Sequence, residues 1–217
     1  MEFTILYDNE AKKGLKNGHG FSCLVEGQSK MLVDVGWDGC LLLSNMERLG
    51  INIETIDSIF LSHNHWDHIG GLPTILNLNT HLEVFYPTWF SKNLKHEVEA
   101  RARLQEISGA AKLADGAYTT GELGKDIKEQ SLIVSSDRGN IIITGCSHPG
   151  LGVIINEAQQ FGNVYGVIGG FHGFDEYDVL EGIRMIVPCH CTQHKKEIKE
   201  LYPDTCEIGY AGKIITI

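Results

Sequence analysis

Three imidazoles and one carboxylate fall within six residues of this chain, in the segment Ser62-His63-Asn64-His65-Trp66-Asp67-His68. A helix cannot aim all four side chains at one point, and a strand turns alternate side chains to opposite faces. A tight loop can bring the four groups together. Neutral imidazole and carboxylate are good ligands for zinc and for metals of borderline softness such as iron and manganese. The segment therefore predicts a metal site rather than a solvated histidine-rich turn.

The residues on either side predict where this loop lies. Ile59-Phe60-Leu61 before it is apolar and fits a buried strand, and Ile69-Gly70-Gly71-Leu72-Pro73 after it fits a turn into a helix. Because α/β folds place their chemistry at the carboxyl ends of strands, we expect the four side chains at such an end.

Three later histidines also follow apolar strands. His148 follows residues 141–145, His172 follows residues 164–170, and His190 follows residues 186–188. One histidine at the end of a strand could equally be a capped surface residue. Three of them, in register with the first motif, indicate metal ligands or other residues of the site.

The rest of the chain predicts the elements that position these groups. Strands are expected at 1–7, 21–26, 31–35, 58–61, 82–86, 131–135, 140–144, 164–168, 185–187 and 213–217. Helices are expected at 41–49, 92–113 (one helix or two), 151–161, 177–182 and 192–201, with Thr192 as an N-cap and a loop at 118–123. Two sets of strands with alternating helices indicate an α/β protein with two sheets packed face to face and helices outside. No linker or repeat divides the sequence, so we expect one domain over 1–217.

Composition limits the partners. The formal net charge of −10 disfavours nucleic acid as a partner. The sequence contains no run of 18 apolar residues, so a membrane span is not expected. The first residues lack the pattern of a signal peptide, so a cytoplasmic protein is expected. We expect its substrate to be a small molecule. We interpret the six cysteines as reduced, small core residues. In Cys189-His190-Cys191, a strand would point both thiols away from the face of His190.

His63-x-His65-x-Asp67-His68 after a strand resembles the signature of the metallo-β-lactamase superfamily. Five other segments resemble its 7,8-dihydropterin-6-yl-methyl-4-(β-D-ribofuranosyl)aminobenzene 5′-phosphate synthase-like subgroup: Gly18-His19-Gly20-Phe21-Ser22, Thr119-Thr120-Gly121-Glu122, Gly145-Cys146-Ser147-His148, Gly169-Gly170-Phe171-His172 and Pro188-Cys189-His190-Cys191-Thr192. The resemblance covers nearly the whole chain and implies a four-layer αββα sandwich.

The resemblance also implies roles for individual residues. His63, His65 and His148 would hold a first metal ion, and Asp67, His68 and His190 a second. Zinc is expected, as one or two ions, with iron or manganese as alternatives. Asp34 would hydrogen-bond a ligand histidine or the loop of residues 62–68, called the metal loop below. The superfamily places a bridging Asp where this chain has Gly170-Phe171-His172, so His172 is expected in the active site, as a ligand of the second metal or as a proton donor.

The function implied is that of a metal-dependent hydrolase, which uses a metal-activated water on a small, phosphate-bearing ester or phosphodiester. Asp67 would orient the nucleophile as well as bind metal. The expected substrate contacts are His19, Ser22, Thr119 and Thr120, the two threonines together with backbone amides serving the phosphate. The alternatives are a phosphoribosyl- or pterin-type transferase or lyase, and a non-catalytic metal sensor that lacks an open coordination position. The sequence does not indicate the oligomeric state.

Overall fold

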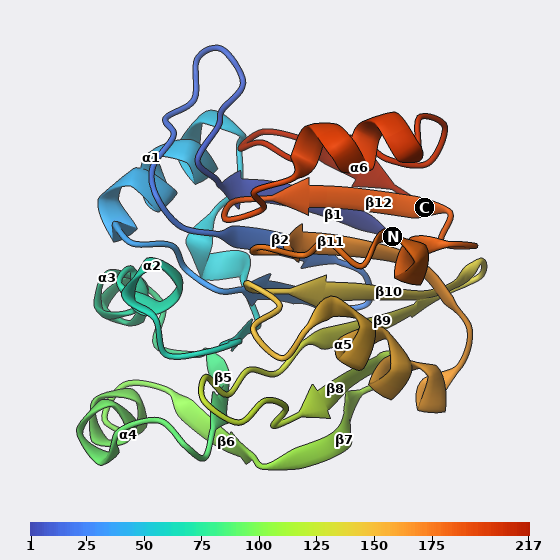
Figure 1. The fold of residues 1–217 in the computed structure, drawn as a ribbon. Helices are drawn as coiled ribbons and strands as arrows, with labels where there is room; N and C mark the ends of the chain where they lie inside the picture. The colour runs from blue at the N-terminus through green and yellow to red at the C-terminus, as the bar shows by residue number, and fades with distance from the viewer. The chain divides into compact units, whose positions relative to one another are not determined.

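The computed structural model describes residues 1–217 and divides the chain into two compact units (Figure 1). Unit 1 comprises residues 1–108 and 210–217, and unit 2 comprises residues 109–209. Each unit is built on one β-sheet. The single domain expected over 1–217 stays a prediction.

Unit 1 contains a seven-stranded sheet with the order β13-β1-β2-β3-β4-β5-β6. Its strands are β1 (Glu2–Tyr7), β2 (Ser22–Glu26), β3 (Lys30–Val33), β4 (Ser58–Phe60), β5 (Glu83–Pro87), β6 (Arg103–Ile107) and β13 (Ile214–Thr216). The four strands from β3 to β6 run parallel, so their carboxyl ends meet at one edge of the sheet.

One face of this sheet is covered by helices (Figure 1). They are α1 (Gly39–Arg48), α2 (Trp66–Ile69), α3 (Leu72–Leu78) and α4 (Lys92–Glu99), with a 3-10 turn η1 (Ile53–Thr55). Leu24, Leu32, Ile59 and Val84 are paired in register across β2 to β5. This apolar row packs in one buried cluster with residues of α1, α3 and α4. Burial of that row fixes the register of the strands that carry the metal loop.

Unit 2 contains a six-stranded sheet with the order β12-β11-β10-β9-β8-β7. Its strands are β7 (Gly109–Ala114), β8 (Ala117–Gly121), β9 (Leu132–Ser136), β10 (Gly139–Thr144), β11 (Val164–Gly170) and β12 (Met185–Cys189). Its helices are α5 (Leu151–Ala158) and α6 (Lys195–Leu201), with 3-10 turns η2 (Gln159–Phe161) and η3 (Tyr177–Leu180). Strands β10, β11 and β12 are parallel neighbours.

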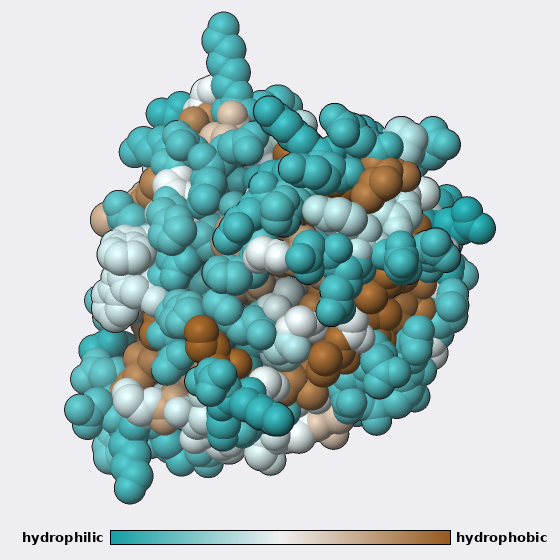
Figure 2. Space-filling model, viewed as in Figure 1, coloured by the Kyte–Doolittle hydropathy of each residue, from teal (hydrophilic) through white to brown (hydrophobic).

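The core of unit 2 lies between its sheet and its helices. Ile133, Ile142, Val167 and Ile186 form a second row in register. They pack in one buried cluster with apolar residues of α5 and α6. The face seen in Figure 2 is mainly hydrophilic, with small apolar patches. No helix of the protein is both long enough and apolar enough to cross a membrane.

Most of the expected elements are confirmed. Every predicted strand occurs within two residues of its expected ends, and the helices at 41–49 and 151–161 match α1 and α5 with η2. The strand signals were reliable because apolar β-branched residues are flanked by turns.

Four expectations about local structure are wrong. Residues 92–113 form α4 and then the strands β6 and β7, and 118–123 is mostly the strand β8. Pairing of β6 with β5 and of β7 with β8 overrides the helical propensity of Ala, Leu, Arg and Glu. The last long helix begins at Lys195 after the cap His194. Thr192 instead donates through Oγ1 to the Cys189 carbonyl (2.7 Å) and accepts from the Phe171 amide (2.9 Å).

The fourth correction concerns cysteine. Cys23, Cys189 and Cys206 are buried, as expected of core residues, but Cys40 is exposed and Cys191 is only half-buried. The strand β12 stops at Cys189, and His190 takes a left-handed φ of 42°. The alternation assumed for Cys189-His190-Cys191 is therefore broken at His190.

Candidate metal centre

In unit 1, the metal loop lies where the sequence predicts it, directly after β4. The ring centroids of His63 and His65 are 4.6 Å apart, and those of His63 and His68 are 4.1 Å apart. Asp34 follows β3, the parallel neighbour of β4, and ligand atoms of Asp34, His63 and His68 lie within 4.8 Å of one another. The loop thus brings the three imidazoles together beside a buried carboxylate.

Asp34 is the acceptor at the centre of this group. It is fully buried. Its Oδ1 accepts from the Ser62 amide (2.8 Å), and its Oδ2 accepts from the Ser62 hydroxyl (2.6 Å) and from His68 Nδ1 (2.6 Å). The orienting role expected for Asp34 matches these contacts.

These bonds also fix the tautomers of two histidines. Ser62 has one hydroxyl hydrogen, and Asp34 accepts it. At the 2.9 Å contact between Ser62 Oγ and His63 Nδ1 the ring must therefore donate. His68 Nδ1 also donates, to Asp34. In both rings the lone pair is then on Nε2, which is the form of imidazole that binds metal.

We expect Asp34→Asn to weaken metal binding by about 10–100-fold, the usual effect of removing an outer carboxylate partner. Asn tolerates the φ of 53° at this position. Its amide NH₂ would donate to His68 Nδ1 and move the ring proton to Nε2. Competition with a chromophoric chelator measures the affinity, and nitrogen NMR of the imidazoles reports the tautomer. Asp115→Asn, at an exposed site, is the control; equal metal affinity in the two variants would contradict this role.

Asp67, His19 and Ser22 also lie around the loop of unit 1. Asp67 Oδ2 is 3.2 Å from His19 Nε2 and 3.7 Å from His68 Nε2. The exposed His19 side chain is thus beside a predicted ligand, in keeping with an outer contact. Ser22 is fully buried and donates to the Asp34 carbonyl (2.8 Å). Its hydroxyl holds the Asp34 backbone, so its position gives no support to a substrate contact.

In unit 2, the three predicted histidines follow three parallel strands in turn. His148 comes after β10, His172 after β11 and His190 after β12. The ring centroids of His148 and His172 are 5.0 Å apart. His190 is buried, His148 is half-buried and His172 is exposed. One edge of this sheet therefore gathers all three imidazoles, as the strand-end pattern predicts.

Glu129 was missed by sequence reasoning and holds the loop that carries His148. This buried carboxylate accepts through Oε1 from the Thr144 hydroxyl and from the amides of residues 145–147 (2.9–3.0 Å). Its Oε2 accepts from the His148 amide (3.0 Å). Nothing in the sequence distinguishes Glu129 from a surface glutamate, because its partners are backbone groups brought close by the fold.

Backbone strain coincides with the predicted site. Only four non-glycine residues have a positive φ: Asp34 (53°), Ser147 (59°), His172 (48°) and His190 (42°). Each lies in a strand-end loop of its own unit, at or beside a residue assigned above. Such conformations cost about 1–3 kcal/mol each and persist where surrounding contacts impose them, commonly at functional sites.

Two cysteines also lie among the histidines of unit 2. A hydrogen bond with the Cys146 side chain is the main cause that lowers the pKa of the Cys191 thiol to about 6. Burial opposes this shift, and the His190 charge and hydrogen bonds with His172 add to it. By contrast, burial alone raises the pKa of Cys23 to about 12, as expected of a core thiol.

Thr119 and Thr120 are buried in β8 of unit 2. Thr119 Oγ1 donates to the Gln130 side chain (2.9 Å) and accepts from the Gly121 amide (3.0 Å). Thr120 Oγ1 donates to the Gly121 carbonyl and accepts from the Ser131 amide. Both hydroxyls are engaged within the fold, so their positions give no support to the predicted phosphate contact.

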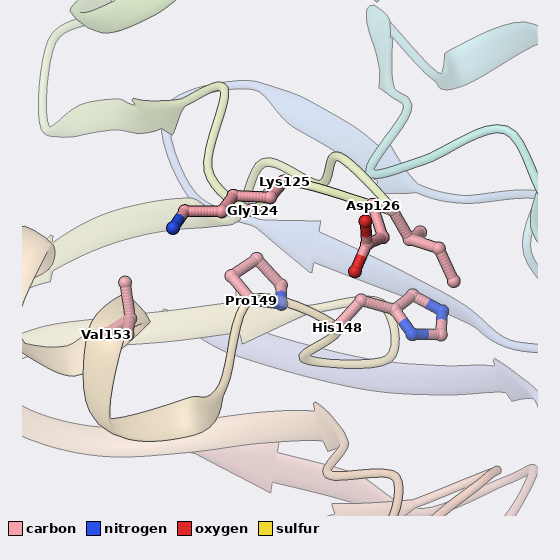
Figure 3. A pocket seen from close by; sticks show the side chains of 7 residues that line it. Gly124, Lys125, Asp126, His148, Pro149 and Val153 are labelled. Atoms are coloured by element: carbon pink, nitrogen blue, oxygen red, sulfur yellow. The ribbon is translucent and has the colours of Figure 1, made fainter.

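Two cavities of unit 2 border on His148. The Lys125 cavity, of about 520 Å³, is lined by Lys125, Asp126, His148 and Val153 among others. In Figure 3 the Asp126 carboxylate points toward the His148 imidazole, while the Lys125 chain extends to the other side. The His172 cavity, of about 290 Å³, is lined by His148, His172, Phe174 and Asp175 among others. A ligand at His148 would therefore meet carboxylates and an aromatic ring nearby, with the Lys125 ammonium on the other side of the larger cavity.

The donor chemistry of both units fits a divalent metal. In unit 1 two imidazoles are held with Nε2 as the lone-pair nitrogen, and in unit 2 imidazoles and thiols share one sheet edge. Such nitrogen, carboxylate and sulfur sets bind zinc and iron, whereas magnesium and calcium take oxygen.

Comparisons with known proteins agree with this chemistry. Residues 16–158 match the family model of the metallo-beta-lactamase superfamily. The 7,8-dihydropterin-6-methyl-4-(β-D-ribofuranosyl)-aminobenzene-5′-phosphate synthase of Methanocaldococcus jannaschii is 30% identical over an alignment of 262 positions, which covers 91% of this chain and 89% of the synthase.

Solved structures show the same fold. A metal-dependent hydrolase of the β-lactamase superfamily superimposes with a TM-score of 0.84 at 24% identity, covering 100% of this chain and 99% of its own. A diphosphatase of the PhnP family gives a TM-score of 0.71 at 14% identity, covering 100% and 97% of the two chains.

Proposed function

Because this chain belongs to the metallo-β-lactamase superfamily, whose fold implies a metal cofactor, we propose that it is a metal-dependent hydrolase of small esters or phosphodiesters. The observation that carries the proposal is the Asp34–Ser62 network, which sets the tautomers of His63 and His68. A buried carboxylate placed to orient imidazoles in this way serves metal binding, and surface histidines do not need it.

The proposal keeps the ligand sets that the family resemblance implies. His63, His65 and His148 would bind one ion. Asp67, His68 and His190 would bind another. When bound, the metal supplies Lewis acidity and an activated water for attack on the substrate.

The chain itself supplies the proton transfers and the orientation. Asp67, whose Oδ2 is 3.2 Å from His19 Nε2, would orient the nucleophile as well as bind metal. His172 is an exposed imidazole that lines a cavity with His148. An imidazole at that position would act as a general acid toward a leaving oxygen.

The substrate proposed is a small molecule with an anionic group, preferably a phosphate. Lys125 lines the larger cavity at His148 and replaces Thr119 and Thr120 as the expected donor. A local cation is needed because the formal net charge of the chain is −10. The relative from M. jannaschii is a synthase whose name includes a 5′-phosphate, which favours the same chemical class.

That relative also supports a second candidate, a pterin- or phosphoribosyl-type transferase. The 262 aligned positions exceed the 217 residues of this chain, so the synthase has additional segments. For this reason its reaction is the second candidate and hydrolysis is the first. Turnover in heavy-oxygen water separates them, because only hydrolysis places solvent oxygen in the product.

The test is a panel of phosphodiesters, lactones and thioesters, assayed with metal-depleted protein and after addition of zinc, manganese or ferrous iron. We expect turnover that requires metal and is fastest on a phosphate-bearing ester. Lys125→Ala should raise KM for that ester about fivefold, equivalent to about 1 kcal/mol, and leave KM for a neutral lactone unchanged. Lys112→Ala, on an exposed ion pair with Asp115, is the matched control. Metal binding without turnover on any class would contradict the hydrolase proposal and leave the transferase and a regulatory metal-binding module as candidates.

A further inference from the structure

Cys146 lies between two of the predicted ligands of unit 2. Its Sγ is within 4.8 Å of a ring nitrogen of His148 and, separately, within 4.8 Å of a ring nitrogen of His190. These histidines follow different strands and are assigned to different ions. A sulfur at this position is close enough to bind the same metal as either histidine.

The backbone holds Cys146 as firmly as it holds His148. The amides of both residues donate to the buried Glu129 carboxylate, at 2.9 and 3.0 Å. Cys146 itself is 3% exposed. The Glu129 carboxylate therefore fixes the backbone from which the Cys146 sulfur and the His148 imidazole both extend.

Cys191 lies against Cys146 from the neighbouring loop. The two side chains are hydrogen-bonded, and Cys191 is also hydrogen-bonded to His172. The left-handed His190 turns the chain so that Cys191 leaves the strand direction, and Thr192 ties this loop to Phe171. The fold thus holds the Cys191 thiol in contact with the Cys146 thiol.

At the end of β11, where the superfamily carries its bridging Asp, the Cys191 sulfur fills the space beside Gly170. A Cβ added to Gly170, the last residue of β11, would lie 2.6 Å from Cys191 Sγ and 2.6 Å from the Gly145 carbonyl oxygen. No side chain can therefore extend from position 170. Asp67 is then the one carboxylate among the six residues proposed as metal ligands, and a cysteine thiolate would add a second anionic donor of a type that zinc accepts.

We propose that Cys146 is a metal ligand of this centre, located between His148 and His190, and that Cys191 is the positioning residue that holds its sulfur. This rests on the proposed function for the existence of the metal centre, although it does not depend on which bond the enzyme cleaves. On coordination the Cys146 S–H bond breaks and the sulfur binds as thiolate; its proton moves to Cys191, whose S–H then donates to the metal-bound sulfur. A thiolate donor selects zinc or iron over manganese and magnesium.

Cobalt substitution tests this without an activity assay. The full-length protein is depleted of metal and titrated with Co²⁺. We expect an intense thiolate-to-cobalt charge-transfer band in the near ultraviolet, which nitrogen and oxygen ligands do not give. Cys146→Ser should abolish the band. Cys191→Ser should keep the band and weaken cobalt affinity by about 10–100-fold, as loss of an outer contact does. Cys40→Ser, at an exposed thiol, should change neither quantity.

Two results would overturn the assignment. One is a cobalt-loaded native protein without the band, and the other is a Cys146→Ser protein that retains it. If Cys146→Ser does not fold, X-ray absorption of the native zinc protein decides: a sulfur shell at about 2.3 Å supports the ligand, and a shell of nitrogen and oxygen alone excludes it. Failure of the hydrolase proposal appears separately, as metal binding with the sulfur band intact but no turnover.

Discussion

Replacing Glu129 by alanine is expected to lower the free energy of unfolding by about 3–5 kcal/mol, since each buried N–H left without an acceptor costs about 1–3 kcal/mol and such costs do not add fully. The carboxylate accepts four backbone amides and one hydroxyl inside unit 2. Urea unfolding monitored by circular dichroism measures the loss.

Glu129→Gln separates stability from metal binding. The glutamine oxygen can take the place of Oε1 and keep four of the five bonds, whereas its NH₂ would face the His148 amide, which is also a donor. We therefore expect a smaller loss of stability together with displacement of His148 and weaker metal binding. Glu181→Gln, at an exposed position of the same unit, should stay within about 0.5 kcal/mol of the native protein. A Glu129→Gln protein with native metal affinity would show that this loop does not carry a ligand.

The contrast between Glu129 and His63 shows what a single sequence could reveal. His63, His65, His68 and Asp67 were predicted as ligands because such side chains lie close together in the sequence, and the later histidines because each follows an apolar strand. The strands themselves were predicted because rows such as Leu24, Leu32 and Ile59 use residue types that suit buried β-structure.

The features that were missed depend on contacts between distant residues. Glu129 has an ordinary glutamate's neighbours in sequence, and its role comes from the turn that follows β10. The strands β6 and β7 were predicted as helix because their residue types favour helices. They are strands because pairing with β5 and β8 outweighs that local propensity. The position of Cys191 follows from a positive φ at His190. Histidine adopts this conformation more often than most residues do, but the sequence alone does not show which of the histidines will adopt it.

The proposed ligands of the first metal ion include two histidines that are far apart in the chain. We propose that His63 and His148 bind the same metal ion. We expect His63→Ala and His148→Ala each to remove that ion and to abolish metal-dependent turnover, because a site of three protein ligands that loses one imidazole rarely retains its metal. Mass spectrometry of the intact protein under native conditions and elemental analysis count the bound ions.

His172 provides the comparison within the same experiment. If it is the proton donor, His172→Ala should keep the native number of metal ions and lose turnover, by about 10²–10⁴-fold for a missing general acid. If it is a ligand of the second ion, His172→Ala should lose one ion, and His172→Asp should bind that ion more tightly than the native protein does. His96→Ala, on α4 of unit 1, is the control for replacing a histidine. A His63→Ala protein with its full metal content would refute the assignment of the first ion, and a His148→Ala protein with full metal content would remove His148 from that ion's ligands.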